Sequence, residues 1–323
     1  MTKIKAGIYG AAGYTAGELL RLLVHHPEVE ITCAQSESQF GKPVSQLHKD
    51  LIGDLNLAFV RALDLSSIDI LFLCKGHGES RVYLESIDIP DALKVIDLSN
   101  DFRLKETADG FVYGLPELNK ELIEQTNKLA NPGCFATCIQ LGLLPAAQLG
   151  MIQSEIHTTG ITGSTGAGQS LSPTSHFSWR QSNMSVYKAF NHQHLDEIGE
   201  SLQQVSSVEQ HINFIPFRGN FTRGIIATSY FNSDQSEEAV VKAYQEYYQD
   251  HPFVNVVEFN PDLKMVVNTN KAVVYVSKHG EKVMIISLID NLLKGASGQA
   301  VQNMNLMFGL PEKQGLNLKS TAF

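Results

Sequence analysis

Residues 3–23 read KIKAGIYGAAGYTAGELLRLL and decide the fold of the first part of the chain. Residues 3–10 form a short apolar run that is typical of a buried strand. Apolar side chains at positions 19, 20, 22, 23 and 24 indicate an amphipathic helix that begins near Thr15. The stretch GAAGYTAG (10–17) joins the two. A strand, a glycine-rich turn and a helix in this order predict a dinucleotide-binding turn.

Each part of this turn has a physical role. Gly10 permits the tight turn after the strand, and Gly13 lets the backbone approach a pyrophosphate. The free N–H groups and the positive dipole end of the following helix attract the same anion. The spacing is G-x-x-G-x-x-A, so a purely structural glycine turn stays as the alternative. The predicted cofactor-binding residues here are Gly10, Ala12, Gly13, Tyr14, Thr15 and Ala16.

The end of the second strand indicates which dinucleotide is bound. Enzymes that select NAD usually carry Asp or Glu there to bind the ribose 2′-hydroxyl. In CAQSES (33–38) the hydroxyls of Ser36 and Ser38 stand at the expected position, and these suit a 2′-phosphate better. Glu37, one residue past the strand tip, could face either way, so the NAD type of ribose contact stays as the alternative. The predicted cofactor is NADP(H).

Further strands, EVEITCAQ (28–35), IDILFLCK (68–75) and ALKVIDLS (92–99), alternate with helical segments and predict a parallel sheet. After about residue 150 the β-branched segments at 212–217, 223–231, 272–278 and 282–290 follow one another closely, which favours a mostly antiparallel sheet. The expected fold is α/β: a Rossmann-type domain at 1–133 with a returning C-terminal helix at 295–323, and an α+β catalytic and dimerisation domain at 134–294.

Composition excludes several classes of function. The 323 residues are 43% hydrophobic and 18% charged, with a net charge of −9, which is globular and disfavours nucleic-acid binding. No apolar window is long enough for a membrane span, and the amino terminus does not resemble a signal peptide. The four cysteines are scattered, as expected for free thiols in the cytoplasm.

One of these cysteines has an unusual setting, LANPGCFATC (129–138). Asn-Pro-Gly is a turn sequence, and the segment after it is helical until Pro145, which should end or kink the helix. Cys134 therefore falls in the first turn, where the helix dipole stabilises a thiolate. The alternative is a small buried side chain, as expected for Cys138 one turn further on. No second Cys/His pair is near, so no metal site is predicted.

A cysteine nucleophile needs an acid or base, and FNHQHLDEI (190–198) offers His192 and His194 near a helix start. Glu197 lies three residues beyond His194, where it can orient that imidazole. Either histidine is compatible with the role, and two unrelated surface histidines are the alternative. Glu197 favours His194.

These motifs occur in the same order as those of a known family. GAAGYTAGELLRLL, VIDLSNDFRL (95–104), VYGLPEL (112–118), LANPGCFAT (129–137), TGSTGAG (162–168), HQHLDEI (192–198) and KGASGQAVQNMN (294–305) resemble the signatures of the N-acetyl-γ-glutamyl-phosphate reductases, within the aspartate-semialdehyde dehydrogenase superfamily. The resemblance covers nearly the whole chain, and the cysteine motif is its most specific part.

The resemblance implies an NADP-dependent enzyme of arginine biosynthesis that reduces an N-acylated γ-glutamyl phosphate to its semialdehyde. Cys134 would carry the thioester, His192 or His194 would be the acid/base, and Glu197 would orient it. The family is typically a homo-oligomer, here a dimer or tetramer. Candidates for the substrate anions are Arg103, Asn131 and Arg223, and candidates near the cofactor are Ser164, Gly166, Gly168 and Asn303.

The chain departs from the family pattern at several positions. Ala16 replaces a glycine, Cys138 a smaller residue, Lys75-Gly76 the usual Leu-Pro, and Phe217-Arg218 a His-Leu pair. The last change leaves open a sister reductase for an N-succinyl-glutamyl, aminoadipyl or aspartyl phosphate, because Arg218 could meet an extra carboxylate. A non-catalytic NADP-binding protein is the alternative from another class.

Overall fold

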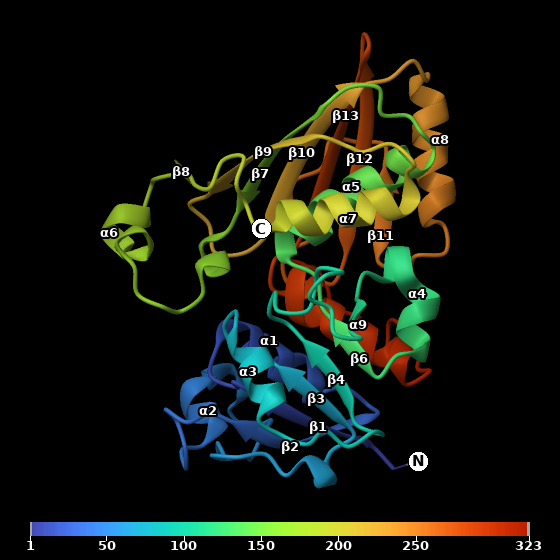
Figure 1. The fold of residues 1–323 in the computed structure, drawn as a ribbon. Helices are drawn as coiled ribbons and strands as arrows, with labels where there is room; N and C mark the ends of the chain where they lie inside the picture. Colours follow the sequence, from blue (N-terminus) through green and yellow to red (C-terminus); the bar gives the residue numbers. More distant parts are fainter. Residues whose placement is uncertain (1, 322–323) are drawn as a thin grey trace. The chain divides into compact units, whose positions relative to one another are not determined.

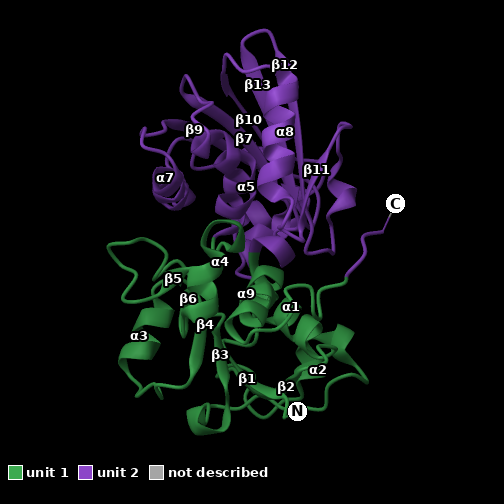
Figure 2. Cartoon of the chain, turned by 90° about the vertical axis from the view of Figure 1, so that its right-hand side faces the viewer, with its two compact units in different colours: residues 1–132, 296–317 green, residues 133–295, 318–323 purple. Residues whose placement is uncertain are grey.

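The computed structural model describes residues 2–321. The chain divides into two compact units (Figure 2), residues up to 132 with 296–317, and residues 133–295 with 318 onward. The first boundary lies one residue from the predicted one. The expected C-terminal helix at 295–323 is wrong in extent: the helix α9 spans Gly298–Met307, and residues from 318 group with the second unit.

Unit 1 is built on a parallel six-stranded sheet (Figure 1). Its order is β2-β1-β3-β4-β6-β5, and every pairing is parallel. The strands are β1 (Ile4–Tyr9), β2 (Val29–Gln35), β3 (Ile70–Leu73), β4 (Lys94–Asp97), β5 (Val112–Tyr113) and β6 (Lys128–Ala130). Since β2 and β3 flank β1 on opposite sides, the strand order reverses at β1, and ligands of such sheets bind at the carboxyl ends of strands at this point.

The helices of unit 1 are α1 (Tyr14–Leu23), α2 (Val44–Leu47), α3 (Glu79–Glu85), α4 (Pro116–Gln125) and α9. The return of the C-terminal helix to the first domain is confirmed, because α9 packs against α1 and α4. It is buried along its whole length. The Asn305 side-chain oxygen accepts from His26 Nε2 across 3.0 Å, and its amide nitrogen donates to the carbonyl of Gln314 across 2.9 Å, which anchors the helix.

Unit 2 contains a seven-stranded mixed sheet of order β11-β12-β13-β10-β7-β9-β8 (Figure 1). The strands are β7 (Ile156–Thr162), β8 (Ser185–Val186), β9 (Ile212–Arg218), β10 (Ile225–Asn232), β11 (Val254–Val257), β12 (Ala272–His279) and β13 (Lys282–Ile289). The pairings β7–β10, β10–β13, β12–β13 and β8–β9 are antiparallel, while β7–β9 and β11–β12 are parallel. The prediction of a mostly antiparallel sheet is confirmed.

The helices of unit 2 are α5 (Cys134–Gln148), α6 (Phe177–Arg180), α7 (His194–Val205) and α8 (Glu237–Tyr248). Helix α5 packs against β10, β12 and β13 and is covered by α7 and α8. Every residue of α5 from Phe135 to Ala147 is buried. The core of unit 2 therefore lies around this one helix, and its first residue is fixed by the packing of the rest. Within residues 2–321 no helix is both long and apolar enough to cross a membrane.

Pro145 does not end α5, although the sequence predicted an end or a kink there. The helix continues to Gln148. A proline has no N–H to donate to the carbonyl four residues earlier, here that of Leu141. The Tyr248 hydroxyl of α8 donates to this carbonyl across 2.6 Å. A tertiary hydrogen bond thus replaces the missing helical one.

We predict that Tyr248→Phe lowers the free energy of unfolding by about 1–3 kcal/mol, the cost of leaving a buried carbonyl without its donor. Urea unfolding followed by circular dichroism measures this. Tyr230→Phe is the matched control, since the Tyr230 side chain is exposed on β10, and it should change stability by less than about 0.5 kcal/mol. Equal stability of the two variants would show that the Leu141 carbonyl does not need Tyr248.

Candidate active site

Cys134 is the first residue of α5, as the sequence predicted. Gly133 precedes it with extended backbone (φ −69°, ψ 150°) and, as a glycine, has no side chain of its own to cap the helix. The first helical bond runs from Thr137 N to Gly133 O, at 2.8 Å. Cys134 is half-buried, whereas residues 135–147 of the helix are buried. The cysteine thus stands at a helix end whose dipole favours negative charge.

Helix α7 brings His194 and Glu197 to the same helix end. The Gly133 amide donates to Glu197 Oε2 across 2.9 Å. The other oxygen, Oε1, lies 3.8 Å from His194 Nε2. A side chain at Gly133 would overlap the His194 imidazole. The structure therefore brings the residue before the cysteine, the histidine and the acid into one cluster, which the spacing of HQHLDEI had suggested.

A second glycine keeps space around the thiol. A Cβ atom on Gly295 would approach Cys134 Cβ to 2.9 Å, closer than side chains tolerate. Gly295 belongs to unit 2 and is the second residue of the KGASG segment (294–298) that follows β13. Gly295 therefore leaves space beside Cys134, and Gly133 leaves space for the His194 ring.

His192 has a different environment from His194. Its Nδ1 accepts a hydrogen bond from the His194 amide across 3.2 Å. The buried ring lies edge-on to Phe135, Tyr187 and Phe214. Burial lowers the pKa of His192 to about 4, and the positive charges of nearby cations add to this effect. Near neutral pH the ring is therefore uncharged and its Nδ1 is already in use.

The other cysteines are poor nucleophiles. Cys138 is fully buried and donates to the Ser287 carbonyl across 3.2 Å. Burial raises the pKa of the Cys138 thiol to about 12. Burial also raises the pKa of Cys74 and of Cys33. The prediction that Cys138 is a buried side chain agrees with this depth in the helix.

Arg223, a predicted substrate residue, is paired within the protein. Its Nε and Nη2 atoms donate to the two oxygens of Asp290 across 3.1 and 3.2 Å. Asp290 is completely buried and also accepts from the Leu292 amide across 2.8 Å. This bidentate pair fixes the plane of the guanidinium. Sequence reasoning could not have found it, because the partners are 67 residues apart.

The two other predicted anion-binding residues form a network in unit 1. The Arg103 Nε atom donates to the Asn131 carbonyl across 2.9 Å. The Asn131 side chain donates to the Ala296 carbonyl across 3.1 Å and accepts from Asn303 across 3.1 Å. Asn303 is fully buried and also donates to the Gly114 carbonyl, at 2.8 Å. The structure therefore places Asn303 against Asn131.

Unit 1 has a cavity of about 470 Å³ at the carboxyl ends of β1, β2 and β3. Its lining residues are Gly10, Ala12, Gly13, Ser36, Glu37, Ser38, Cys74, Lys75 and Gly76. Gly10 has φ +78°, the left-handed conformation that glycine adopts readily. Its amide donates to the Gln35 side chain across 3.2 Å. The glycine turn, the second strand end and the third strand end thus form one site.

This cavity fits a dinucleotide. A Cβ atom built on Gly13 would meet nothing within 4 Å, so the backbone lies open toward a ligand. The first turn of α1 carries no acidic side chain that would repel a pyrophosphate. Ser36 and Ser38, with hydroxyls 3.5 Å apart, line it together with Lys75, and exposed Glu37 also lines it.

Other predicted cofactor residues lie elsewhere in the fold. Tyr14, Thr15 and Ala16 begin α1 but do not line the cavity, and the Thr15 carbonyl accepts from Ser297 across 2.7 Å. Ser164, Gly166 and Gly168 belong to unit 2, in a loop bonded to residues 221–222. Sequence reasoning missed Lys75 as a lining residue, although its departure from the family pattern was a usable signal.

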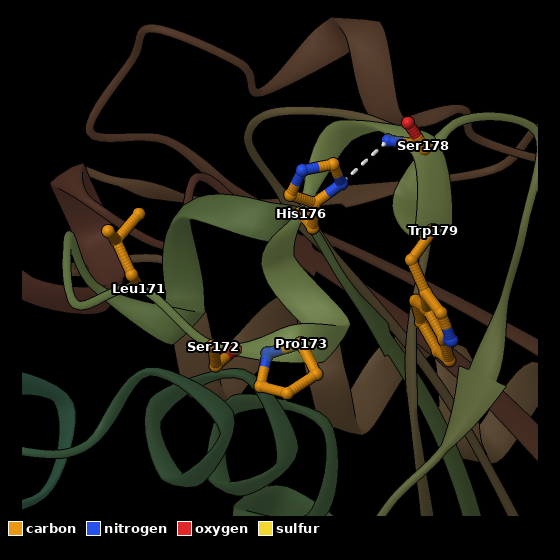
Figure 3. Close-up of a pocket in the computed structure, with 6 residues that line it drawn as sticks. All are labelled: Leu171, Ser172, Pro173, His176, Ser178 and Trp179. Carbon is orange, nitrogen blue, oxygen red and sulfur yellow. Dashed lines mark hydrogen bonds between the residues drawn. The ribbon is translucent and has the colours of Figure 1, made fainter.

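A second cavity, of about 660 Å³, lies in the segment 171–190 of unit 2, which contains α6 and is called the arm below (Figure 3). Its lining residues are Leu171, Ser172, Pro173, His176, Ser178 and Trp179. His176 Nδ1 accepts from the Ser178 amide across 3.3 Å, the dashed line in Figure 3. The walls are largely apolar, and several large side chains of the arm are exposed. The cavity contains none of the predicted catalytic residues.

Comparisons with known proteins agree with these two units. Residues 5–126 match the family model "Semialdehyde dehydrogenase, NAD binding domain", and residues 134–291 match "Semialdehyde dehydrogenase, dimerisation domain". A solved aspartate semialdehyde dehydrogenase II from Vibrio cholerae, complexed with ASA, has a TM-score of 0.74 at 16% identity, covering 96% of this chain and 99% of that one. The enzyme from Candida albicans, solved with NADP, has a TM-score of 0.72 at 15% identity, covering 95% and 99%.

The fold and the cysteine site thus define a semialdehyde dehydrogenase. Much closer relatives exist in sequence. Proteins named N-acetyl-γ-glutamyl-phosphate reductase from Azobacteroides pseudotrichonymphae, Parabacteroides distasonis and Flavobacterium johnsoniae are 56%, 54% and 52% identical to it, each over 99% of this chain and 100% of the relative. The chain belongs to the N-acetyl-γ-glutamyl-phosphate reductase family.

We predict that iodoacetamide at pH 8 modifies Cys134 first. A thiol with a pKa near 12 is thiolate to only about one part in ten thousand at this pH, so Cys138 should stay unlabelled in the folded protein. Peptide mass spectrometry locates the adduct. Cys134→Ser should lose the fast phase, and Cys138→Ser should keep it. Fast labelling of Cys138 instead would contradict this assignment.

Proposed function

We propose that the chain reduces N-acetyl-γ-glutamyl phosphate with NADPH to N-acetylglutamate semialdehyde and phosphate, through a thioester on Cys134. The observation that carries the proposal is the cluster of Cys134, Gly133, His194 and Glu197 at the start of α5. The names of the relatives support this reaction, a step of arginine biosynthesis, over the succinyl, aminoadipyl and aspartyl alternatives. The four free cysteines support a cytoplasmic enzyme.

NADP(H) is the proposed cofactor. The glycine turn at Gly10 and Gly13 would hold the pyrophosphate, and the hydroxyls of Ser36 and Ser38 with the ammonium of Lys75 would bind the 2′-phosphate. When bound, this cofactor supplies a hydride. The C. albicans relative in fold was solved with NADP, which supports the same choice here.

The Cys134 thiolate performs the first chemical step. Its sulfur attacks the γ-carbonyl carbon, and the C–O bond to phosphate breaks with its electron pair, leaving a thioester and free phosphate. The hydride that NADPH would supply would reduce this thioester, and a proton on the new oxygen would give a hemithioacetal. Loss of the C–S bond then returns the thiolate and releases the aldehyde as the hydroxyl loses its proton.

His194 is the proposed acid/base that moves these protons. His192 Nδ1 accepts from the His194 amide, and its low pKa leaves it uncharged, so it is suited to positioning. His194 instead has Nε2 against Gly133, next to the nucleophile, with Glu197 3.8 Å away to stabilise its protonated form. The preference for His194 in the sequence thus gains a physical reason.

Substrate anions are proposed to bind at Arg103, Asn131 and Arg223. Arg103 and Asn131 are bonded to each other, which pre-organises both. Asp290 orients Arg223 through two hydrogen bonds. Because the backbone and Asp290 hold these side chains, ligand binding would cost little side-chain entropy. Ser164, Gly166, Gly168 and Asn303, with Tyr14, Thr15 and Ala16, remain proposed cofactor contacts.

The reverse reaction tests this function. NADP⁺ reduction, followed by absorbance, should require both N-acetylglutamate semialdehyde and phosphate. Cys134→Ala should abolish it, and His194→Asn should lower kcat by about 10²–10⁴-fold, the usual contribution of a general acid/base. His192→Asn should lower kcat less. Turnover that survives in Cys134→Ala would reject the thioester, and a larger loss in His192→Asn would reverse the histidine assignment.

We also propose that the enzyme is a homo-oligomer, a dimer or tetramer. The segment 171–190 exposes large apolar side chains at Leu171, Phe177, Met184, Val186 and Phe190. Exposed apolar groups gathered on one arm are typical of an interface. The family description "dimerisation domain" for residues 134–291 supports the same assignment.

The double substitution Leu171→Asp and Phe177→Asp should therefore shift the protein toward monomer. Light scattering after gel filtration measures the mass. Ile52→Asp is the control, because Ile52 is equally exposed but lies in unit 1, far along the sequence from the arm. An oligomer that tolerates both aspartates would place the interface on another surface.

A further inference from the structure

Arg218 differs from the other two arginines of unit 2 that pack near the sheet. Arg223 is paired with Asp290. Arg180 is buried, and its guanidinium donates to the carbonyls of Thr174 and Arg218 across 3.1 and 2.8 Å. Among residues 2–321, Arg218 has no ion pair with an acid, and its Nε is a buried atom without a hydrogen-bond partner. This half-buried cation therefore has no acidic partner in the described part of the chain.

The backbone holds Arg218 firmly. It is the last residue of β9, where it pairs with Thr162 of β7 on one side and Ser185 of β8 on the other. Its guanidinium carbon lies 4.7 Å above the centre of the Tyr187 ring. A cation–π contact of this kind compensates part of the charge without neutralising it, and the Tyr187 side chain also hydrogen-bonds Arg218, whose Nε keeps no partner.

The same tyrosine connects Arg218 to the reacting cysteine. Burial raises the pKa of the Tyr187 phenol to about 12, and the charge of Cys134 raises it while that of Arg218 lowers it, so both groups are within electrostatic reach of one hydroxyl. The Tyr187 ring also lies 5.8 Å from His192, whose ring is 4.6 Å from His194. Arg218 is thus part of the wall around the catalytic cluster.

The charges near this wall are mainly positive. The positive charge of Arg218 acts on Arg180, and the positive charges of Lys188 and Arg218 act on His192. The acid nearby, Glu197, is bonded to the Gly133 amide. A substrate anion at Arg218 would therefore meet an unpaired guanidinium in a partly desolvated setting, where a charge-assisted pair is strong. The guanidinium edge matches a carboxylate in shape.

We propose that Arg218 is a specificity-determining residue that binds a carboxylate of the acylated glutamyl substrate. This inference rests on the proposed function. The carboxylate has two possible sources, the α-carboxylate of the glutamyl part or a carboxylate carried by the N-acyl cap, such as succinyl. In either case Arg218 selects substrates by charge and takes no part in bond making.

Kinetics on wild type, Arg218→Gln and Arg218→Lys test this. Gln keeps much of the packing on Tyr187 without the charge, and Lys restores the charge. In the reverse reaction we expect Arg218→Gln to raise KM for the semialdehyde about 10- to 100-fold, with kcat and KM for phosphate changed less than about threefold, and Lys to recover part of the loss. Lys282→Ala is the control, since Lys282 lies over the Tyr230 ring at 5.5 Å on the exposed part of β13.

Two substrates distinguish the two sources of the carboxylate. An equal increase in KM for N-acetyl- and N-succinylglutamate semialdehyde in Arg218→Gln assigns the α-carboxylate. An increase in KM confined to the succinyl compound assigns the carboxylate of the cap. Unchanged KM for both compounds, or an increase in the KM for phosphate alone, overturns the proposal.

Calorimetric titration with N-acetylglutamate and N-succinylglutamate measures binding without turnover, so it tests the role of Arg218 separately from the proposed reaction. Weaker binding by Arg218→Gln than by wild type supports Arg218 even in an enzyme without phosphate-dependent turnover, whereas absent turnover in wild type rejects the reaction. Equal binding by both proteins, or no binding by wild type, rejects the role of Arg218. Thermal melting of each variant confirms that it is folded.

Discussion

A single buried carboxylate, that of Glu197, joins the amino-terminal ends of two helices in unit 2. One oxygen accepts from Gly133 at the start of α5, and the other faces His194 at the start of α7. The Gln140 side chain of α5 donates to the Glu197 carbonyl across 3.2 Å, which adds a second link about two turns further along α5. Burying a carboxylate is costly unless amides and positive helix ends surround it. Because the donating amide belongs to Gly133, the residue beside Cys134, a shift of one helix against the other would remove a hydrogen bond from this buried carboxylate.

This link also explains why glycine is required at two positions near the thiol. The Glu197 contact brings the Gly133 backbone against the His194 ring, and a Cβ atom has no space there. Gly295, in the segment after β13, approaches Cys134 in the same manner. A side chain at either glycine would displace the cysteine or the histidine. Packing density, rather than local turn geometry, fixes these two residue types, because neither glycine has a positive φ angle.

The sequence predicted the parts of the molecule that depend on local patterns. The strand–turn–helix pattern at Gly10 and Gly13, the helix start at Cys134 and the i, i+3 spacing of His194 and Glu197 are all found. Features that depend on distant partners were not predictable. Pro145 continues its helix because of a hydroxyl 103 residues later, at Tyr248 (248 − 145 = 103). The extent of the C-terminal helix was also wrong, since its end depends on contacts of Asn305 with the following loop.

The histidines and arginines of unit 2 show how environment separates identical side chains into different roles. His192 and His194 are two residues apart, yet one is desolvated among aromatic rings and bonded at Nδ1, while the other faces a carboxylate. Arg223 meets the buried carboxylate of Asp290, which neutralises it and fixes its plane. Arg218 meets an aromatic ring, which stabilises a cation without neutralising it. Because the half-buried Arg218 has no acidic partner among residues 2–321, it is the better candidate to select an anionic ligand. The paired Arg223 is the better candidate to orient it.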